Sequence, residues 1–209
     1  LAPDMTRPQV IAGIDRITRQ LGGVTKTWRF DRMATVCHPA TGHVTAEFAA
    51  VAKHYGVSVA VCPPRRGNRK GVVEKSNHTA AQRWWRTLPD EATADQAQTS
   101  VDTFCRTRSD FRLRPTRDGR ASVVTIAKRE PLRRAPAAPY PAVLTETRQV
   151  CRQALVSWKG NHYSVPPEVA MSEVTVTETL GDGHIDIATT SGIVIARHPM
   201  APRGSGAQV

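Results

Sequence analysis

The most unusual chemical setting in the sequence belongs to Glu74, a single carboxylate at the end of an arginine-rich loop. The loop runs from Cys62 to Asn77, and four basic residues precede the acid: Arg65, Arg66, Arg69 and Lys70. One interpretation is a solvated loop that holds an ordinary glutamate. The other is a site in which the carboxylate and the cations act together, so the surrounding elements are needed to choose between them.

Those elements alternate between helix and strand, and they bring a second acid, Asp31, to the same region. Apolar residues recur at helical spacing in three segments, residues 6–21, 44–55 and 74–88. Short alternating runs at 28–30 and 57–61 indicate strands. Helices between strands predict a parallel pair with right-handed connections. Asp31 follows the first strand and Glu74 lies beyond the second, at the edge where functional groups of open α/β sheets gather.

The charge of the chain is strongly positive and unevenly distributed. The 209 residues carry 29 Lys and Arg against 18 Asp and Glu, which gives a net charge of +11. Residues 104–139 hold ten of the basic residues and three of the acidic ones. This balance favours a polyanionic partner such as nucleic acid. The alternative is a basic protein whose arginines reflect the base composition of its genome.

Beyond residue 103 the pattern changes to a linker and an all-β region. Residues 104–146 are basic and rich in proline, which predicts an extended linker that contacts phosphate groups or only solvent. Residues 147–198 contain five short alternating runs with tight turns, typical of a small β-barrel. Residues 199–209 are rich in Gly, Ser and Ala, and we expect this tail to be disordered.

Several classes of protein are disfavoured by the sequence. The four cysteines form no C-x-x-C pair and the histidines are scattered, so a zinc or redox motif is not indicated. No signal peptide and no apolar run of membrane-spanning length occurs. We therefore expect a cytoplasmic, nucleoid-associated protein with free thiols and no membrane partner.

The loop and its neighbours resemble the large transposase subunits of the IstA type, which contain a retroviral-integrase-type DDE catalytic core. The run from Lys70 to Glu74 resembles the motif that ends on the third catalytic acid of that family. Other matching features follow in the family's order: Gly22-Gly23, Asp31, His54-Tyr55-Gly56, Gly160 to Pro166, and Ile195 to His198. The resemblance extends over nearly the whole chain.

The resemblance implies a fold class of α/β followed by all-β. Residues 1–103 are expected to be an incomplete RNase-H-like integrase core that lacks the family's first three strands, and residues 147–198 a small SH3-like β-barrel. The first catalytic aspartate of the family lies on the first missing strand. Asp4 and Asp15 are poor substitutes for it, so we expect this chain to be inactive alone. The chain also departs from the family at Arg32, where Asn is frequent.

The resemblance also implies the chemistry, which is phosphodiester hydrolysis and strand transfer at two Mg²⁺ ions. Asp31 and Glu74 are the implied catalytic residues and metal ligands. The implied contacts to the DNA backbone are Arg65, Arg66, Arg69, Lys70, Lys75 and Arg86. The implied partners are transposon ends and target DNA, further copies of the chain, and an ATP-dependent helper protein.

Two other functions stay open on the sequence. The chain could be a non-catalytic DNA-binding remnant or a protein-interaction module, in which case Asp31 and Glu74 would have no role in its activity. The C-terminal half alone is also compatible with an RNA-binding or ribosome-associated barrel protein.

Overall fold

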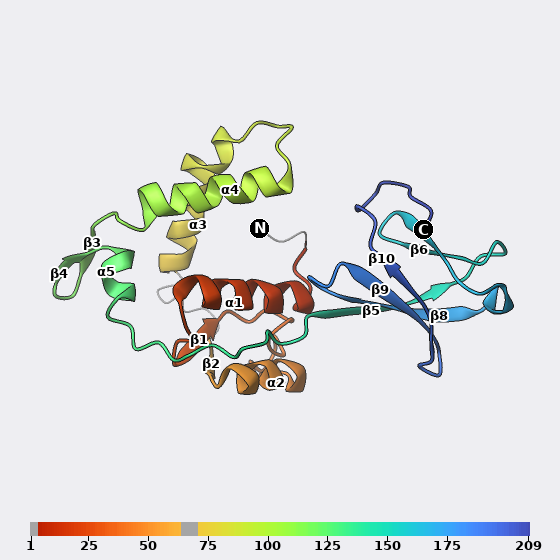
Figure 1. Ribbon diagram of the computed structural model, residues 1–209. Helices are drawn as coiled ribbons and strands as arrows, with labels where there is room; N and C mark the ends of the chain where they lie inside the picture. Colours follow the sequence, from red (N-terminus) through yellow and green to blue (C-terminus); the bar gives the residue numbers. More distant parts are fainter. Residues whose placement is uncertain (1–3, 64–70) are drawn as a thin grey trace. The chain divides into compact units, whose positions relative to one another are not determined.

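The computed structural model describes residues 4–63 and 71–209, and for residues 71–74 it describes the backbone only. The described chain divides into two compact units. One is Gly13–Ala138 together with the described residues 4–5, and the other is Pro139–Val209 together with Thr6–Ala12. The first mixes helices with short strands and the second is mainly β-sheet (Figure 1). The expectation of an α/β region followed by an all-β region is confirmed at this level.

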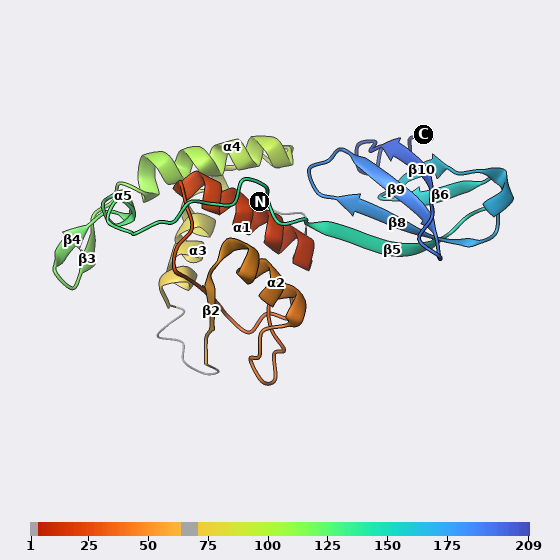
Figure 2. The same cartoon turned by 60° about the horizontal axis from the view of Figure 1, so that its bottom comes forward.

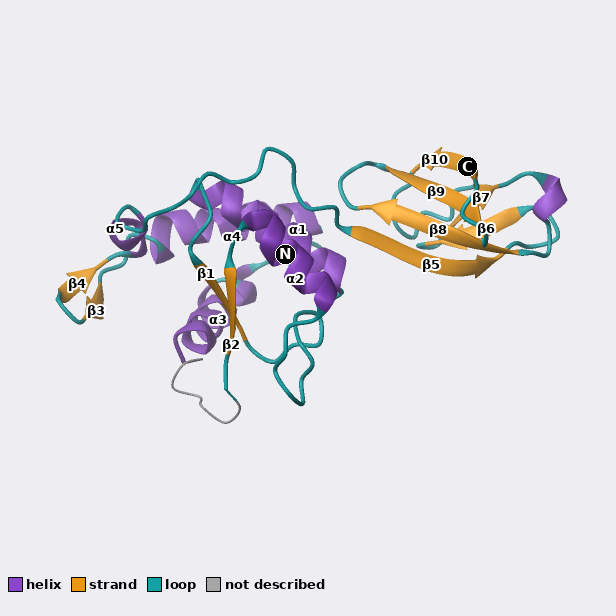
Figure 3. Cartoon of the chain, turned by 90° about the horizontal axis from the view of Figure 1, so that it is seen from below, coloured by secondary structure: helices purple, strands orange, loops and turns teal. Residues whose placement is uncertain are grey.

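The first unit is built around two short parallel strands. The chain forms α1 (Arg7–Leu21), β1 (Thr27–Phe30), α2 (Ala46–Tyr55) and β2 (Ser58–Val61). The strands pair in parallel from Thr27 opposite Ser58 to Phe30 opposite Val61, and they run side by side in Figure 3. The two helices lie on either side of this pair (Figure 1). The predicted parallel pairing is therefore confirmed for these two strands.

Local signals fix the ends of α2, and aromatic packing fixes its inner face. The Thr45 hydroxyl accepts a hydrogen bond from the Phe48 N–H, and Gly56 ends the helix in the left-handed conformation at φ 64°. The Phe48 ring packs edge-on against Phe30 of β1, with 5.2 Å between the ring centroids. The Tyr55 ring packs at a tilt against Trp28, two residues earlier in β1, with 5.3 Å between the ring centroids. The helix is thereby bound to β1.

The helix that follows the arginine-rich loop is shorter than the sequence predicts. α3 covers Gly71–Arg83, and a separate 3₁₀ turn, η2, covers Trp85–Thr87, so the predicted continuous helix to residue 88 is wrong. The indole N–H of Trp84 donates to the Ser100 hydroxyl of α4 (Ala94–Phe104) at 3.0 Å. Trp84 is 6% exposed and Trp85 is 58% exposed. Because Trp84 packs against α4, the backbone leaves the α-helical conformation at this residue.

The predicted extended linker is wrong for most of its length. Residues 104–146 contain a π-helical turn, η3 (Cys105–Ser109), a hairpin of β3 (Arg114–Thr116) and β4 (Gly119–Ala121), and the short helix α5 (Val123–Ala127). Figure 2 shows the hairpin followed by α5. Local turn chemistry accounts for the last two. Gly119 adopts a φ of 121° in the hairpin, and the Ser122 hydroxyl caps α5 by accepting from the Thr125 N–H. Strand β5 also begins inside this range, at Val143.

The second unit contains the largest buried core of the described chain. A four-stranded antiparallel sheet has the order β10–β9–β8–β5, and β6 pairs with β7. The strands are β5 (Val143–Gln149), β6 (Leu155–Trp158), β7 (Asn161–Ser164), β8 (Glu173–Thr179), β9 (His184–Thr189) and β10 (Val194–Pro199), and a 3₁₀ turn, η4, covers Pro167–Val169. Alternate residues of these strands point into one core, which includes Trp158, Tyr163, Val176 and Ile187. The five predicted strands are present, and β5 is an addition.

The C-terminal tail is ordered, so the expectation of disorder is wrong. Its backbone pairs alongside β7: the His162 N–H donates to the Ala207 carbonyl, and Val209 exchanges hydrogen bonds of 2.8 and 2.9 Å with Ser164 and His162. The tail's glycines supply turn conformations, with φ of 73° at Gly204 and 68° at Gly206. The glycines that suggested disorder therefore allow the chain to turn sharply and run back along β7.

No helix in the described part of the chain is long and apolar enough to cross a membrane. All four cysteines are free thiols, as expected.

Candidate functional site

Asp31 lies at the carboxyl edge of the parallel strand pair, where the sequence places it. It directly follows Phe30, the last residue of β1. The Cys62 N–H donates to the Phe30 carbonyl at 2.8 Å, which continues the strand pairing one residue past β2. The register therefore puts Asp31 beside Cys62, the residue that opens the arginine-rich loop. The Asp31 side chain is partly buried at this edge.

The other predicted site residues are only partly described. Glu74 is the fourth residue of α3, but its side chain lies outside the described part of the structure. The four basic residues of the loop, Arg65, Arg66, Arg69 and Lys70, also lie outside it. Lys75 is exposed on α3, whereas Arg86 is exposed on η2, beyond the end of that helix. The predicted helix over residues 74–88 therefore does not carry both side chains, because α3 ends at Arg83.

The described residues do not complete a metal site. Among the side chains that the structure describes, no three His, Cys, Asp or Glu residues gather into a group that could hold a metal ion. Asp31 supplies the hard oxygen ligand that Mg²⁺ prefers, and its neighbour across the strand register, Cys62, supplies a thiol. A magnesium site at this edge needs further carboxylates beside Asp31.

Arg32, the residue after Asp31, stabilises the loop between β1 and α2. Arg32 Nη1 donates to the carbonyl oxygens of Pro39 and Ala40, at 3.0 and 2.8 Å. Gly42, at φ 79°, lies against the same guanidinium, and a Cβ there would be 3.3 Å from Nη2. The family departure at Arg32 thus has a structural role, since its guanidinium closes the loop between β1 and α2.

Asp15 is also held in a structural role. The buried Tyr55 hydroxyl donates to Asp15 Oδ1 at 2.7 Å, and Arg19 Nε lies 2.7 Å from Asp15 Oδ2. The hydrogen bond from Arg19 to Asp15 and the negative charge of that carboxylate raise the pKa of Arg19. Asp15 therefore links α1 to α2 and to its own helix.

The structure gathers a group of arginines that sequence reasoning did not combine. Arg83, the last residue of α3, lines a cleft of about 680 Å³ together with Arg108, Arg112 and Arg114 from the segment after α4. In the sequence the last three are only members of the basic segment 104–139, and nothing distinguishes Arg83. No sequence signal joins them, because they come from separate elements.

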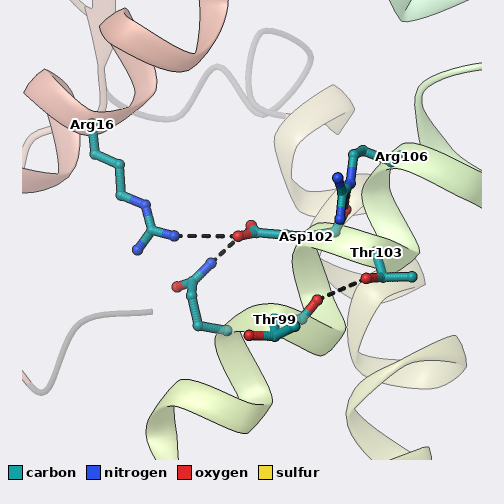
Figure 4. Close-up of polar contacts among 6 residues, drawn as sticks. Arg16, Thr99, Asp102, Thr103 and Arg106 are labelled. Atoms are coloured by element: carbon teal, nitrogen blue, oxygen red, sulfur yellow. Dashed lines mark hydrogen bonds and ion pairs between the residues drawn. The ribbon is translucent and has the colours of Figure 1, made fainter.

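A polar cluster on α4 holds this region against α1. Figure 4 shows Arg16 reaching from α1 to the carboxylate of Asp102, with 3.2 Å between Nη2 and Oδ2. Gln98 donates to the other oxygen of Asp102 at 2.8 Å, and Arg106 Nε donates to the Asp102 carbonyl at 3.4 Å. The end of α4, from which the cleft arginines follow, is thereby attached to α1.

Cys105, at the junction of α4 and η3, is not activated as a nucleophile. Burial raises the pKa of the Cys105 thiol, and the nearby carboxylates of Asp110 and Asp102 raise it further. A raised pKa keeps the sulfur protonated, so this residue is a packing thiol.

Comparison of the sequence with known proteins finds a transposase family and several transposases. Residues 135–208 match the family described as Mu transposase, C-terminal domain. The chain is 26% identical over 159 residues to the "Transposase for insertion sequences IS1326/IS1353" of Pseudomonas aeruginosa and of Shigella flexneri, over 74% of this chain and 31% of each relative. It is 26% identical over 163 residues to a "Transposase" of Aminobacter aminovorans, over 76% of this chain and 32% of that protein.

The chain spans about a third of the length of these curated relatives. Among solved structures it aligns with a chain of the "simian T-cell lymphotropic virus intasome in complex with PP2A regulatory subunit B56 gamma", at 12% identity and a TM-score of 0.42, over 96% of this chain and 66% of that one. A similarity of that degree does not define a fold. The sequence relatives confirm the resemblance stated above.

Proposed function

We propose that this chain, which is of the IstA-like transposase type, acts in DNA transposition as a DNA-binding segment that contributes Asp31 and Glu74 to a metal-dependent strand-transfer centre. The observation that carries the proposal is the strand register, which sets Asp31 beside the start of the loop that leads to Glu74. Open α/β sheets bind their ligands at this edge. The transposase relatives, which match three quarters of the chain, support the same assignment.

In the proposed centre, Asp31 and Glu74 hold Mg²⁺, which stabilises the attacking and leaving oxygens of the phosphodiester when it is bound. The basic residues of the loop, Arg65, Arg66, Arg69 and Lys70, hold the DNA backbone beside the carboxylates, and Lys75 and Arg86 add contacts farther along. Such contacts position DNA without reading its bases. In the same proposal, the first unit is part of an RNase-H-like core and the second is a small SH3-like barrel.

The 209-residue chain is expected to bind DNA without joining it. A two-metal centre needs more carboxylates than Asp31 and Glu74, and among the described side chains no three His, Cys, Asp or Glu residues gather into a group that could hold a metal ion. Transposon ends and target DNA are the proposed substrates. Self-association and an ATP-dependent helper protein are proposed as partners on the strength of the family resemblance.

The test combines DNA binding with strand joining by the 209-residue chain. We expect the chain to bind labelled duplex DNA and to join no 3′-OH ends in Mg²⁺. We also expect Mg²⁺ to strengthen DNA binding, and the double variant Asp31→Asn/Glu74→Gln to lose that effect while keeping its metal-free affinity. Asp90→Asn/Glu91→Gln, at two exposed acids, is the matched control. Efficient joining by the chain would refute its inactivity, and absence of DNA binding would refute the function.

The basic segment favours one second candidate, a DNA-binding protein without a catalytic contribution. Residues 104–139 carry ten basic residues, which would bind DNA whether or not a metal centre exists. An identical response of wild type and Asp31→Asn/Glu74→Gln to Mg²⁺ would favour this candidate.

A further inference from the structure

The cleft between the end of α3 and the segment after α4 is built for an anion. Arg83, Arg108 and Arg112 are exposed at its walls, and Arg114 is partly buried among them. No described carboxylate lies within ion-pair distance of any of the four. The hydroxyl group of Ser109 adds an uncharged donor, whereas the Thr107 hydroxyl donates to the Thr103 carbonyl at 2.8 Å. Guanidinium groups match phosphate oxygens in a planar, two-bonded geometry, so the cleft has the chemistry of a phosphate site.

The π-helical turn η3 places residues from both sides of the turn along the cleft. In η3 the Asp110 N–H bonds to the Cys105 carbonyl at 2.9 Å, which is an i to i+5 bond in place of i to i+4. Residues five apart then lie on one face, and Phe104 and Ser109 both line the cleft. Such turns are frequent at functional positions. The Ser109 hydroxyl accepts from Arg114 Nη2 at 3.3 Å, which orients that arginine toward the others.

The size and surroundings of the cleft favour a polymer over a free anion. At about 680 Å³ it exceeds the space that a single phosphate ion needs, and its four arginines would place several like charges around one small ligand. Arg106, Arg117 and Arg120 belong to the same segment and are exposed, so positive charge continues beyond the cleft. A chain of phosphates, spaced along a backbone, satisfies both features.

We propose that Arg83, Arg108, Arg112 and Arg114 form a binding site for the phosphodiester backbone of DNA, separate from the carboxylate edge at Asp31. This inference rests on the proposed function for the identity of its ligand. The lining offers guanidinium and hydroxyl groups, which bind phosphate oxygens, so the site contributes affinity and position without sequence preference.

The test measures duplex DNA binding by the full chain as a function of salt. The triple variant R83Q/R108Q/R112Q removes three charges from the cleft. The matched control, K26Q/R152Q/R203Q, removes three charges from exposed positions outside the cleft and outside the predicted site. A 30-base-pair duplex of arbitrary sequence, followed by fluorescence anisotropy between 50 and 200 mM KCl, is the probe.

We expect the cleft variant to bind more than about tenfold more weakly at 100 mM KCl and its salt slope to fall by roughly 2 to 3, since each lost phosphate contact removes about 0.9. The control should stay within about threefold of wild type, because its charges make only screened, long-range contributions. R83K/R108K/R112K should restore most of the slope, which shows that loss of charge, and not misfolding, caused the defect.

Three outcomes would overturn the proposal. Equal binding by the cleft variant and the control would refute the cleft and leave the proposed function standing, provided that wild type binds DNA. Failure of wild type to bind DNA at any salt concentration would refute both. Tighter binding of an RNA duplex of the same length, lost in the same variant, would keep the phosphate site but refute DNA as its ligand.

Discussion

The indole nitrogen of Trp158 donates a hydrogen bond of 3.0 Å to the carboxylate of Glu178, and each of the two residues is only 2% exposed. Lys159 Nζ lies 2.7 Å from the same carboxylate oxygen and bonds the second oxygen at 2.8 Å. A buried acid is tolerated here because both of its oxygens have donors. The arrangement joins the β6–β7 pair to β8 within the all-β unit.

Replacing this acid should destabilise the all-β unit strongly. Glu178→Ala leaves the buried indole N–H and the Lys159 ammonium without their acceptor, which should cost about 2–3 kcal/mol of unfolding free energy. Glu178→Gln keeps an acceptor for the indole and should cost about 1 kcal/mol. Urea unfolding of the full chain, followed by tryptophan fluorescence, measures both. A Glu178→Ala variant as stable as wild type would show that this network is not required.

The C-terminal tail should detach when Asn161 is changed. The fully buried Asn161 amide donates to the Pro202 carbonyl at 2.9 Å and accepts from the Ser205 hydroxyl and the Ala207 N–H at 2.8 and 3.0 Å. Asn161→Ala removes all three bonds and should cost about 2–3 kcal/mol, because the part-buried backbone groups of Pro202 and Ala207 lose their partners. Hydrogen exchange of residues 202–209 should become fast, whereas exchange in β8 and β9 should be unchanged. Protection of the tail equal to that of wild type would contradict its anchoring by Asn161.

The two adjacent tryptophans should respond differently to truncation. Trp84→Ala removes a buried indole and its hydrogen bond to Ser100, so it should destabilise the first unit by about 3–5 kcal/mol. Trp85→Ala changes an exposed side chain and should cost less than about 1 kcal/mol. Thermal unfolding of the two variants gives the comparison, and similar losses would mean that Trp84 does not fix α3 against α4.

Stability of the all-β unit should depend on pH through Asp186. Its carboxylate accepts two hydrogen bonds from Arg197, which lower the pKa of Asp186 below its ordinary value. The folded state therefore gains stability above an ordinary Asp pKa of about 3.9, and this gain is lost as the pH falls through the lowered value. Asp186→Asn should lower the Tm slightly at pH 7, and the difference should shrink as the pH falls below the ordinary Asp pKa and through the lowered value. The gain is small and sensitive to salt because the pair is exposed.

A matched variant checks that prediction. Glu168→Gln removes one acidic charge from an exposed position of η4 and should leave the Tm unchanged at pH 7 and at acid pH. A Tm difference for Asp186→Asn that persists unchanged at low pH would show that the effect comes from packing rather than from ionisation.

Many helices and strands can be predicted from local sequence signals. The Thr45 cap, the Gly56 stop and the apolar spacing of Phe48, Val51 and Tyr55 define α2 without reference to distant residues. The alternation in β8 and β9 likewise predicts which residues enter the core of the second unit. Asp31 could be placed at the strand edge for the same reason, since helices between strands impose parallel pairing.

The sequence by itself determined these elements, their order and the place of Asp31, because helix caps, periodicity and parallel connections act over short stretches of chain. Only the tertiary structure decided where α3 stops, because Trp84 leaves the helix to bond Ser100 of another element. It also decided that the tail is ordered, through Asn161 some forty residues earlier in the chain. Arg83 and Arg108 line one cleft although they come from separate elements, and no spacing in the sequence predicts such an arrangement.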